Sequence, residues 1–549
     1  MSTHIVLGSA GCGKTFSLIG KVEHEVELGT PLKRICFCTF SKAAAEEARE
    51  RLMSKFGCEK EDLHLCGTIH SICYKNFCTD KKVIKEKQKK LFFKLHHLDY
   101  EVIRSDEDLI TNESNKNIPG NLILNFYDKF RMGSCKDITQ IKSEKELVDI
   151  YSKLNIQSIE YHSLFSNTFN IYKIIKEYEE YLKENDLIDF AGMLLTAYKN
   201  NFIVDADILV LDEFQDLSPI QFFLYRLWAK DKKEIYISGD PNQTIYIFNL
   251  ANADFLLNEI KNLDTSNGDE KIILPKTFRM ASKINTHCSD YINKHMRKDK
   301  HIHSNIEPVK EGGEIIEEEI EGDLSRIGEF IDPNKSTFIL ARTNYYKKKI
   351  IEDFLIPNGI PYGEIKGKSI WDKKAVDIFN MTIKLVEKKS LNEEDAGLLF
   401  ECVPFKLGLM KRGSKIKFKN SIKKDSYDYS DFINEGFNNT LSKFLNYKDI
   451  YDILDISEST KIAFKAAKKE KVELPINLKI STIHGSKGRE ADTVIIFKDI
   501  SKRIAEEASK SVSAFESEIR VFYVGQSRAR EKLVILRGGF NRSEKYMIP

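Results

Sequence analysis

Short apolar runs recur along the chain and end in polar or acidic residues. The first run, His4–Leu7, leads into a glycine-rich segment, and a second run, I-L-V-L at 208–211, ends in Asp212 and Glu213. This pattern is typical of buried parallel strands, whose carboxyl ends lie at the edge of a sheet where ligands bind. Similar runs begin at Glu234, Phe338, Val494 and Lys532. The runs from His4 to Glu234 form one group, and those from Phe338 to Lys532 form another. Because both groups alternate with helical stretches, we expect an α/β fold with two domains.

The segment after the first run reads G-S-A-G-C-G-K-T at residues 8–15. Its three glycines allow a tight turn in which successive N–H groups point at phosphate oxygens. Lys14 is expected to reach the β- and γ-phosphates, and the Thr15 hydroxyl to bind Mg²⁺. This predicts a nucleotide site with ATP and Mg²⁺ as cofactors, rather than a merely glycine-rich turn. The expected cofactor-binding residues of this segment are Gly8, Ser9, Ala10, Gly11, Cys12, Gly13, Lys14, Thr15 and Phe16.

The acids that end the second apolar run supply the other half of this site. Asp212 is expected to bind Mg²⁺, directly or through water, and Glu213 to orient and deprotonate the attacking water. An apolar run ending in acids is also compatible with an ordinary strand cap, but its place after a phosphate loop favours the metal-binding role. A third strand-like run leads from Glu234 to Gln243, an element that a small-molecule kinase does not need.

The composition is that of an ordinary globular protein of 549 residues, with 42% hydrophobic and 31% charged residues. This length allows about two to four domains. We find no apolar stretch of about 18 residues and no leader before the phosphate loop, so we expect no membrane contact. The expected location is cytoplasmic, nucleoid-associated or in the host cytoplasm if the protein is viral. The ten cysteines are scattered, which predicts reduced thiols, with Cys36 and Cys38 buried rather than metal-binding.

The formal net charge is only +2, so no overall field indicates a polyanionic partner. Two local stretches are nevertheless strongly basic. Residues 81–94 carry seven lysines and one glutamate, and residues 406–424 carry eight basic residues and no acid. Such a stretch either follows a nucleic-acid backbone or forms a solvated face, and the charge pattern alone leaves both interpretations open.

Seven further motifs occur in a fixed order along the chain. They are T-F-S-K-A-A-A-E-E-A at 39–48, G-T-I-H at 67–70, D-E-F-Q-D at 212–216, G-D-P-N-Q-T-I-Y-I-F at 239–248, L-P-K-T-F-R at 274–279, T-I-H-G-S-K-G-R-E at 482–490 and E-I-R-V-F-Y-V-G-Q-S-R-A-R at 518–530. In this order, and across nearly the whole chain, they resemble the motifs of the UvrD/Rep group of superfamily 1 DNA helicases. The resemblance implies two RecA-like P-loop domains with parallel sheets, each carrying a mostly helical inserted subdomain, and a nucleotide site between the domains.

The resemblance also implies roles for residues of the second domain. Arg279 and Arg528 hold the motif places of arginine fingers, which stabilise the transferring phosphoryl group only while the cleft is closed. Phe278 stands where the family usually has a tyrosine stacked on the adenine, and Glu490 is expected to meet the ribose. The expected catalytic set is Lys14, Asp212, Glu213, Gln243, Arg279 and Arg528.

The same resemblance implies a track for single-stranded DNA. The residues at DNA-contacting motif positions are Phe40, His70, Tyr246, Phe248 and His484. Aromatic rings stack on bases without reading their sequence. Taken alone, each aromatic side chain is more typical of a core, but its motif position favours the DNA role. In this family, translocation runs 3′ to 5′; the residues alone do not exclude RNA as the track.

Two features depart from the family pattern. Only seven residues precede Gly8, so we expect no upstream glutamine motif for recognising adenine, and a loose base selectivity that admits GTP. The fourth of the seven motifs continues Phe248-Asn249-Leu250-Ala251, where the family commonly has an aromatic residue followed by Arg-Gly-Ala. The arginine's positive charge near the DNA or the cleft is therefore missing.

The motif spacing predicts two insertions. The first RecA-like domain is expected at 1–80 and 186–270, with an accessory helical insertion at 81–185. The second is expected at 271–387 and 476–549, with a second insertion at 388–475 that is shorter than its usual family counterpart. Because that subdomain contacts duplex DNA in relatives, its shortness predicts weak strand separation by the monomer, and its basic stretch is expected to touch duplex phosphates.

Two functions are consistent with these features. The first is an ATP-dependent 3′-to-5′ single-stranded DNA translocase and DNA helicase acting in replication, repair or recombination. The second is a DNA-stimulated NTPase that acts as a regulatory or sensing subunit of a nuclease or defence complex. Expected partners are single-stranded DNA, single-strand/duplex junctions and a protein such as a nuclease or a replication or repair factor.

Overall fold

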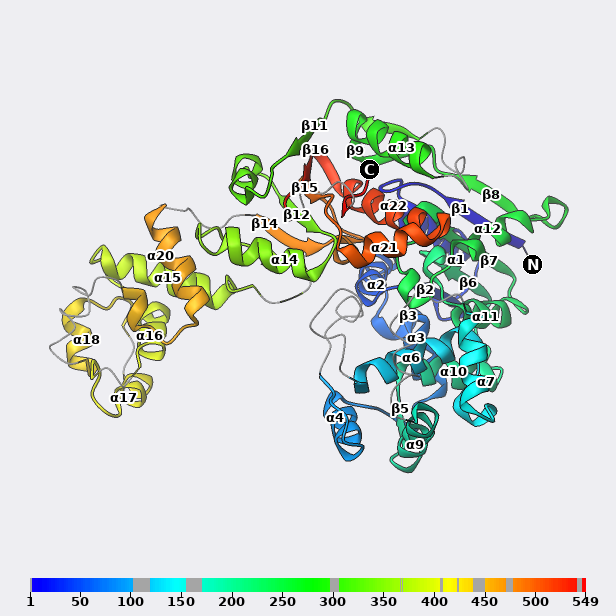
Figure 1. The fold of residues 1–549 in the computed structure, drawn as a ribbon, viewed down its shortest axis with the longest axis horizontal. Coiled ribbons are helices and arrows are strands. Elements are labelled where there is room, and N and C mark those ends of the chain that lie inside the picture. Colours follow the sequence, from blue (N-terminus) through cyan, green and yellow to red (C-terminus); the bar gives the residue numbers. More distant parts are fainter. Residues whose placement is uncertain are drawn as a thin grey trace.

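The computed structural model describes residues 2–101, 119–154, 170–296, 306–365, 367, 369–404, 408–421, 424–437, 450–470, 477–540 and 546–549. Two six-stranded parallel sheets form the centre of the molecule (Figure 1). The predicted α/β class with two parallel-sheet domains is confirmed.

The first sheet has the strand order β3-β2-β6-β7-β1-β8, and its pairs are all parallel. The phosphate loop follows the strand β1, and the acids Asp212 and Glu213 follow β6. The carboxyl ends of these strands therefore meet at one edge of the sheet. The strands are β1 (Ser2–Leu7), β2 (Ile35–Thr39), β3 (Cys66–Thr68), β6 (Ile208–Leu211), β7 (Glu234–Gly239) and β8 (Glu270–Ile273).

Both faces of the first sheet are covered, which explains why its strands are apolar without alternation. Ile208 and Val210 pack with one set of helices, whereas Leu209 and Leu211 pack with the other. The first set is α1 (Lys14–Glu27) and α2 (Lys42–Phe56); the second is α3 (Ile69–Phe77), α10 (Phe190–Lys199), α11 (Pro219–Ala229) and α12 (Ala253–Lys261).

The second sheet repeats this plan with the strand order β11-β16-β15-β12-β14-β13. Its strands are β11 (Glu314–Glu319), β12 (Thr337–Ala341), β13 (Gly363–Glu364), β14 (Leu478–Thr482), β15 (Ala491–Phe497) and β16 (Ala529–Arg537). Val494 and Ile496 pack with α13 (Ser282–His295), α21 (Lys502–Lys510) and α22 (Val512–Gln526), whereas Ile495 and Phe497 pack on the opposite face with α14 (Asn344–Ile350). A separate parallel pair, β9 (Lys276–Ala281) with β10 (Glu307–Lys310), leads into the second domain.

The first insertion is helical where it is described. Its helices, which share a core of their own, are α4 (Glu86–Leu95), α6 (Pro119–Ser134), α7 (Glu144–Ser152) and α9 (Ile171–Glu184). The short strands β4 (Lys82–Val83) and β5 (Leu187–Ile188) pair where the insertion leaves and rejoins the first domain.

A buried arginine ties this insertion to the first domain. Arg131 of α6 is 1% exposed and donates to Asp189 Oδ2 at 2.7 Å and to Glu179 Oε1 at 3.1 Å. Asp189 in turn caps α10 by accepting the Gly192 N–H at 2.8 Å. The carboxylate thus joins a helix of the insertion to a helix that covers the sheet.

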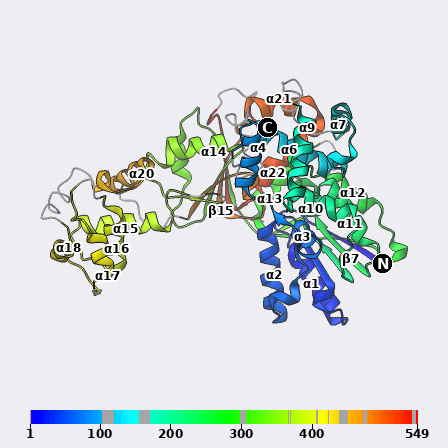
Figure 2. The same cartoon turned by 90° about the horizontal axis from the view of Figure 1, so that it is seen from below.

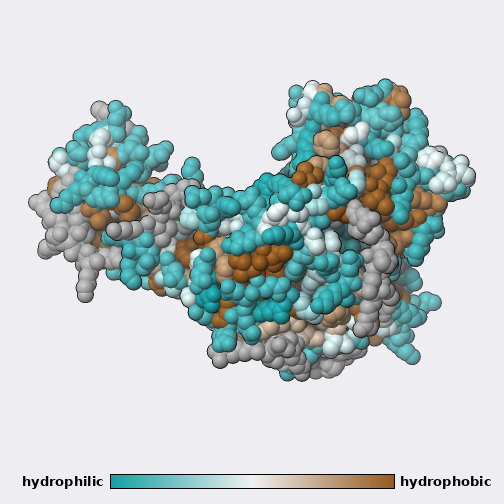
Figure 3. All heavy atoms as spheres, turned by 90° about the horizontal axis from the view of Figure 1, so that it is seen from above, coloured by the Kyte–Doolittle hydropathy of each residue, from teal (hydrophilic) through white to brown (hydrophobic). Residues whose placement is uncertain are grey.

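The second insertion forms a lobe that projects from the main body in both ribbon views (Figures 1 and 2). Its helices are α15 (Lys373–Val386), α16 (Glu393–Cys402), α17 (Ser414–Asn420), α18 (Tyr429–Glu435) and α20 (Glu458–Lys469). Their apolar residues join one core with the α14 face of the second sheet. Most of the face drawn in Figure 3 is hydrophilic, and apolar residues gather there in a few patches.

The sequence-based boundaries between the four parts stay a prediction. The strand β8, Glu270–Ile273, lies across the boundary expected after residue 270 and pairs with β1 of the first sheet. Of the basic stretch 406–424, residues 406, 407, 422 and 423 lie outside the described residues. In the part of the chain that is described, no helix combines the length and apolarity needed to span a bilayer.

The cysteine side chains are free thiols. Cys36 and Cys38 are both buried, with their sulfur atoms 3.6 Å apart, in agreement with the expected buried thiols. Among the described residues, no cluster of His, Cys, Asp and Glu side chains is arranged to hold a metal.

We predict that Arg131→Met destabilises the protein by about 3 to 5 kcal/mol, because it leaves the Asp189 carboxylate buried without its cation. Circular dichroism during urea denaturation measures the effect as a first transition whose midpoint lies at a lower urea concentration. The matched control is Arg326→Met, since Arg326 makes its two ion pairs with Glu318 and Glu329 on the surface. That variant should keep the wild-type midpoint. Equal midpoints for both variants would contradict the role of the buried network.

Candidate nucleotide and nucleic-acid site

The phosphate loop is already formed around its lysine. Gly11 and Gly13 have φ of 77° and 80°, a left-handed conformation that glycine adopts freely. Gly13 immediately precedes α1, so the N–H groups of the first turn of that helix face the loop and are available to phosphate oxygens. Lys14 Nζ donates to the carbonyls of Gly8 at 2.9 Å and Ser9 at 3.2 Å. These contacts hold the ammonium group over the loop, where phosphate charge would lie.

Thr15 and Asp212 meet directly, although 197 residues separate them. The Thr15 hydroxyl donates to Asp212 Oδ2 at 2.5 Å, and the Ser238 hydroxyl donates to the other carboxylate oxygen. Burial raises the pKa of Asp212. A hydroxyl and a carboxylate at the end of a phosphate loop are oxygen ligands of the kind that Mg²⁺ takes. This donor set therefore fits the expected magnesium ion.

Glu213 has a backbone conformation that is unusual for a glutamate. Its φ is 56°, which places it in the left-handed region at the end of β6. Its carboxylate accepts a hydrogen bond from Gln215 Nε2 at 2.5 Å and lies 3.7 Å from Lys487 Nζ. Burial acts to raise the pKa of Glu213, but Lys487 and Lys14 outweigh it, and the pKa is lowered. The carboxylate is thus held ionised, as a general base requires.

The strand β9 crosses the phosphate loop and joins the two domains there. The Phe278 N–H donates to the Gly11 carbonyl at 3.0 Å, and the Thr277 hydroxyl donates to the Ala10 carbonyl at 2.9 Å. A Cβ atom on Gly11 would lie 2.4 Å from Cβ of Arg279. The approach is close enough that only glycine fits at position 11.

Arg528 reaches across the cleft to the first domain. It is 1% exposed, and its Nη2 donates to Gln243 Oε1 at 3.2 Å. Gln243 Nε2 in turn donates to Asp240 Oδ2 at 2.7 Å. Burial lowers the pKa of Arg528 to about 9, so the guanidinium group is charged at neutral pH. The structure therefore places Gln243 and Arg528 together, as the resemblance implies for a site shared between domains.

Arg279 is turned toward Glu490. Arg279 Nε donates to Glu490 Oε2 at 2.6 Å, and its Nη1 donates to the Ser527 carbonyl at 3.4 Å. Glu490, expected at the ribose, is therefore an ion-pair partner of an expected arginine finger in this structure. A nucleotide phosphate that attracted Arg279 would have to compete with this carboxylate.

Two phenylalanines flank the mouth of the phosphate loop. Phe16, in the first turn of α1, is 70% exposed, and Phe278 of β9 is 59% exposed. Their position beside the loop is compatible with the expected stacking on a base.

Four of the expected DNA-contacting side chains form one aromatic row. Phe40 and Tyr246 are stacked with ring centroids 4.8 Å apart, and Tyr246 meets Phe248 edge-on at 5.8 Å. Phe248 meets His484 at 5.4 Å, so the row runs from the first domain into the second. The Tyr246 hydroxyl also donates to the His484 carbonyl at 3.4 Å.

The fifth side chain, His70, pairs instead with a residue that the sequence analysis did not single out. Its ring meets Phe190 edge-on at 6.0 Å, and Phe190 is 62% exposed. Burial lowers the pKa of His70 to about 4, so this ring is neutral at physiological pH. Since β2 and β3 are adjacent, Phe40 and His70 follow neighbouring strand ends. Phe190 begins α10, and it is recognised only by its exposed ring in the folded chain, which the sequence does not show.

Lys487 was also missed, and it contacts both groups of residues. Its Nζ forms an ion pair with Asp216, donates to the Gln243 carbonyl at 2.8 Å and lies 5.1 Å from the centroid of the Tyr246 ring. Burial raises the pKa of Asp216 to about 7, even though Lys487 acts in the opposite direction. Lys487 thus joins the acids of the nucleotide site to the aromatic row.

Comparison with known families agrees with this arrangement. The family described as the UvrD/REP helicase N-terminal domain matches residues 1–264, and the UvrD-like helicase C-terminal domain matches residues 428–537. The matches cover the phosphate loop, the acids after β6, Gln243, Lys487 and Arg528. The chain belongs to the UvrD/Rep-like family of DNA helicases.

Several relatives in this family are distant in sequence. The protein YjcD of Bacillus subtilis is 24% identical over 97% of this chain and 76% of its own length. The ATP-dependent DNA helicase Rep of Buchnera aphidicola is 22% identical over 70% of this chain and 56% of its own length. The ATP-dependent DNA helicase PcrA of Staphylococcus aureus is 23% identical over 68% of this chain. The chain spans three quarters of YjcD and about half of Rep and PcrA.

We predict that Gly11→Ala lowers hydrolysis at least about 100-fold, because the new Cβ atom forces β9 and Arg279 away from the phosphate loop. Gly20→Ala is the matched control, since a Cβ atom on Gly20 meets nothing within 4 Å. Steady-state phosphate production measures both variants. If both kept wild-type turnover, the close packing of β9 on the loop would be irrelevant to the reaction.

Proposed function

We propose that this chain is an ATP-driven motor that moves 3′ to 5′ along single-stranded DNA and separates strands at a junction. The observation that carries the proposal is the position of Lys487. One buried cation contacts Asp216, the Gln243 carbonyl and the Tyr246 ring. If nucleotide binding shifts Asp216 or Gln243, Lys487 would move with them, and with it the contact to the Tyr246 ring. The direction of movement rests on family membership.

In the proposed reaction, the residues of the first domain bind the triphosphate. Lys14 and the loop N–H groups hold the β- and γ-phosphates, and Thr15 with Asp212 would hold Mg²⁺. The ion, when bound, neutralises part of the phosphate charge. Glu213 accepts a proton from the attacking water, which its ionised carboxylate can do at neutral pH.

The second domain completes the site only when the cleft is closed. Arg528 already lies against Gln243, so a γ-phosphate bound there would be within reach of its guanidinium group. Arg279 would either leave Glu490 to bind the phosphate, or stay paired with Glu490 and hold that carboxylate beside the ribose. After cleavage the charge that attracted the arginines is reduced, and the cleft can open.

Movement along DNA would follow from the aromatic row. Phe40, Tyr246 and Phe248 belong to the first domain, whereas His484 belongs to the second. Opening and closing of the cleft changes the spacing between these rings, so bases stacked on them would be gripped differently in the two states. Phe190 and His70 would extend the same track.

A second candidate is a DNA-stimulated NTPase that drives a partner such as a nuclease. The observation that favours it is the second insertion, which forms a lobe of short helices on one side of the second domain (Figure 1). We propose this lobe as the place where a protein partner or duplex DNA is contacted. In either case, the protein would act in the compartment that holds its DNA.

The test is steady-state hydrolysis of ATP and GTP, with and without a single-stranded oligonucleotide, for wild type and Arg528→Ala. We expect DNA to stimulate the wild type, and the variant to lose at least about 100-fold in turnover. Comparable rates with ATP and GTP would agree with the expected loose base selectivity. Wild-type hydrolysis that ignores DNA would contradict the proposed motor.

Strand displacement on a duplex with a 3′ single-stranded tail separates the two candidates. Displacement of the duplex by the purified chain would support the helicase. DNA-stimulated hydrolysis without displacement, at every protein concentration, would favour the partner-driving NTPase. A duplex with a 5′ tail is the control for direction.

A further inference from the structure

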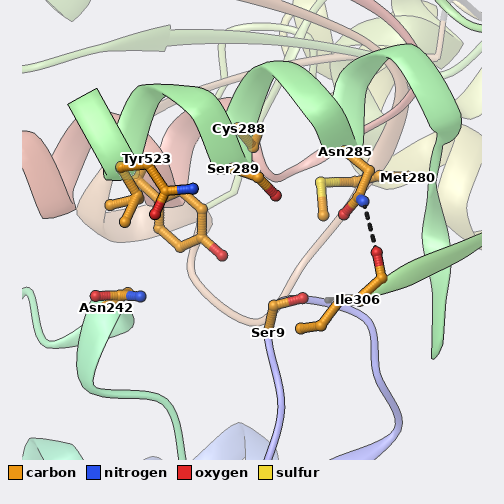
Figure 4. A pocket seen from close by; sticks show the side chains of 10 residues that line it. Ser9, Asn242, Met280, Asn285, Cys288, Ser289, Ile306 and Tyr523 are labelled. Carbon is orange, nitrogen blue, oxygen red and sulfur yellow. Dashed lines mark hydrogen bonds between the residues drawn. The ribbon is translucent and has the colours of Figure 1, made fainter. Parts of the chain in front are cut away.

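A pocket opens between the two domains, on the side of the phosphate loop that faces α13 (Figure 4). The pocket is partly open to solvent. Ser9 and Asn242 of the first domain form one wall, and the hydroxyl groups of Ser289 and Tyr523 point toward them from the other (Figure 4). Asn285 and Asn293 of α13 also line it. Apart from Ser9 of the phosphate loop, none of these residues has a role assigned above.

The inner end of the pocket borders the groups expected around a γ-phosphate. The Ser9 carbonyl accepts from Lys14 Nζ at 3.2 Å, so Ser9 is part of the phosphate loop. Asn242 directly precedes Gln243, which accepts from Arg528 at 3.2 Å. Tyr523 lies in the last turn of α22, and its carbonyl accepts from the N–H of Ser527, the residue just after the helix, at 2.9 Å.

The lining is polar but uncharged. Hydroxyl and amide groups predominate, and among the described residues that line the pocket there is no carboxylate. The carboxylate of Asp240, which lies under Asn242, is engaged by Gln243 Nε2 at 2.7 Å and by the Asn242 N–H at 3.0 Å. Neutral donors solvate an anion without holding it as an ion pair would. Such a lining suits the passage of a phosphate ion better than its storage.

The strand β9 covers part of the phosphate loop, with the Phe278 N–H on the Gly11 carbonyl and Arg279 on Glu490. Its residue Met280 also lines the pocket. After cleavage, the diphosphate still occupies the loop and its base would lie near Phe278. A phosphate ion released while the diphosphate is bound would lie next to this pocket, which Ser9 and Asn242 line.

We propose that this pocket is the exit by which inorganic phosphate leaves after hydrolysis. The proposal rests on the proposed NTPase function. The phosphate ion passes between Ser9 and Asn242, is solvated by the hydroxyl groups of Ser289 and Tyr523, and leaves past Asn293 at the exposed end of α13. Phosphate release and diphosphate release then follow separate routes.

The test blocks the pocket and times cleavage and release separately. In Ser289→Phe, a bulky ring replaces a half-buried hydroxyl that points into the pocket. Acid-quenched samples in the presence of single-stranded DNA measure cleavage, and a fluorescent phosphate-binding protein measures release of inorganic phosphate. We expect an unchanged first-turnover cleavage rate and a release rate lowered about ten-fold, so that phosphate accumulates on the enzyme.

Two further variants make the outcome decisive. Asn293→Phe narrows the exposed rim without touching the core and should give the same delay if Ser289→Phe does not fold. Thr286→Phe adds the same ring to an exposed position of α13 outside the pocket, and should release phosphate as the wild type does. Release that keeps pace with cleavage in both pocket variants would overturn the exit. Absence of any hydrolysis by the wild type would overturn the proposed function itself, and the exit with it.

Discussion

The cleft depends on charge balance around buried carboxylates. Asp212, Asp216 and Asp240 of the first domain are at most 4% exposed, and Glu213 lies beside them. Carboxylates gathered this closely repel one another unless cations are near. The loop supplies one cation, Lys14, and the second domain supplies two more, Lys487 and Arg528. The domains therefore fit together as a matched set of charges, which the arrival or loss of a phosphate group must disturb.

In the proposed motor, this charge balance would link the nucleotide site to the aromatic row. Lys487 balances the negative charge of Asp216 while its Nζ also contacts the Gln243 carbonyl and lies beside the Tyr246 ring. If added charge at the nucleotide draws Lys487 away, the ring loses its neighbour and the row from Phe40 to His484 is free to shift. In the proposed motor, the coupling would pass through this short chain of direct contacts.

Much of the fold could be predicted because its signals are local. Apolar runs that end in acids, such as I-L-V-L before Asp212, predict buried parallel strands with functional residues at their carboxyl ends. The glycines at 11 and 13 adopt the left-handed conformations that a phosphate loop requires. The sequence also places Gln243 and Arg528 by their motifs, and the structure brings them together. The roles assigned to the site residues stay predictions, because contacts in the folded chain do not themselves measure chemistry.

Other features could not be predicted, because they depend on packing between distant segments. Lys487 lies within the motif at 482–490, but the motif does not show that its side chain, 7% exposed, pairs with Asp216, which is 271 positions away. Phe190 is recognisable only by its exposure beside His70. Leu250 stands where the family commonly has glycine, and it adopts a φ of 65°, in the left-handed region that favours glycine. Its side chain alone does not indicate this conformation.

The most direct test of the coupling is thermodynamic. The Kd of a fluorescent oligothymidylate is measured by anisotropy with and without a saturating non-hydrolysable ATP analogue, in wild type and Lys487→Met. The account predicts that the analogue changes the wild-type Kd by at least about five-fold, and that most of this change is lost in the variant. A wild-type Kd that the analogue leaves unchanged would contradict it.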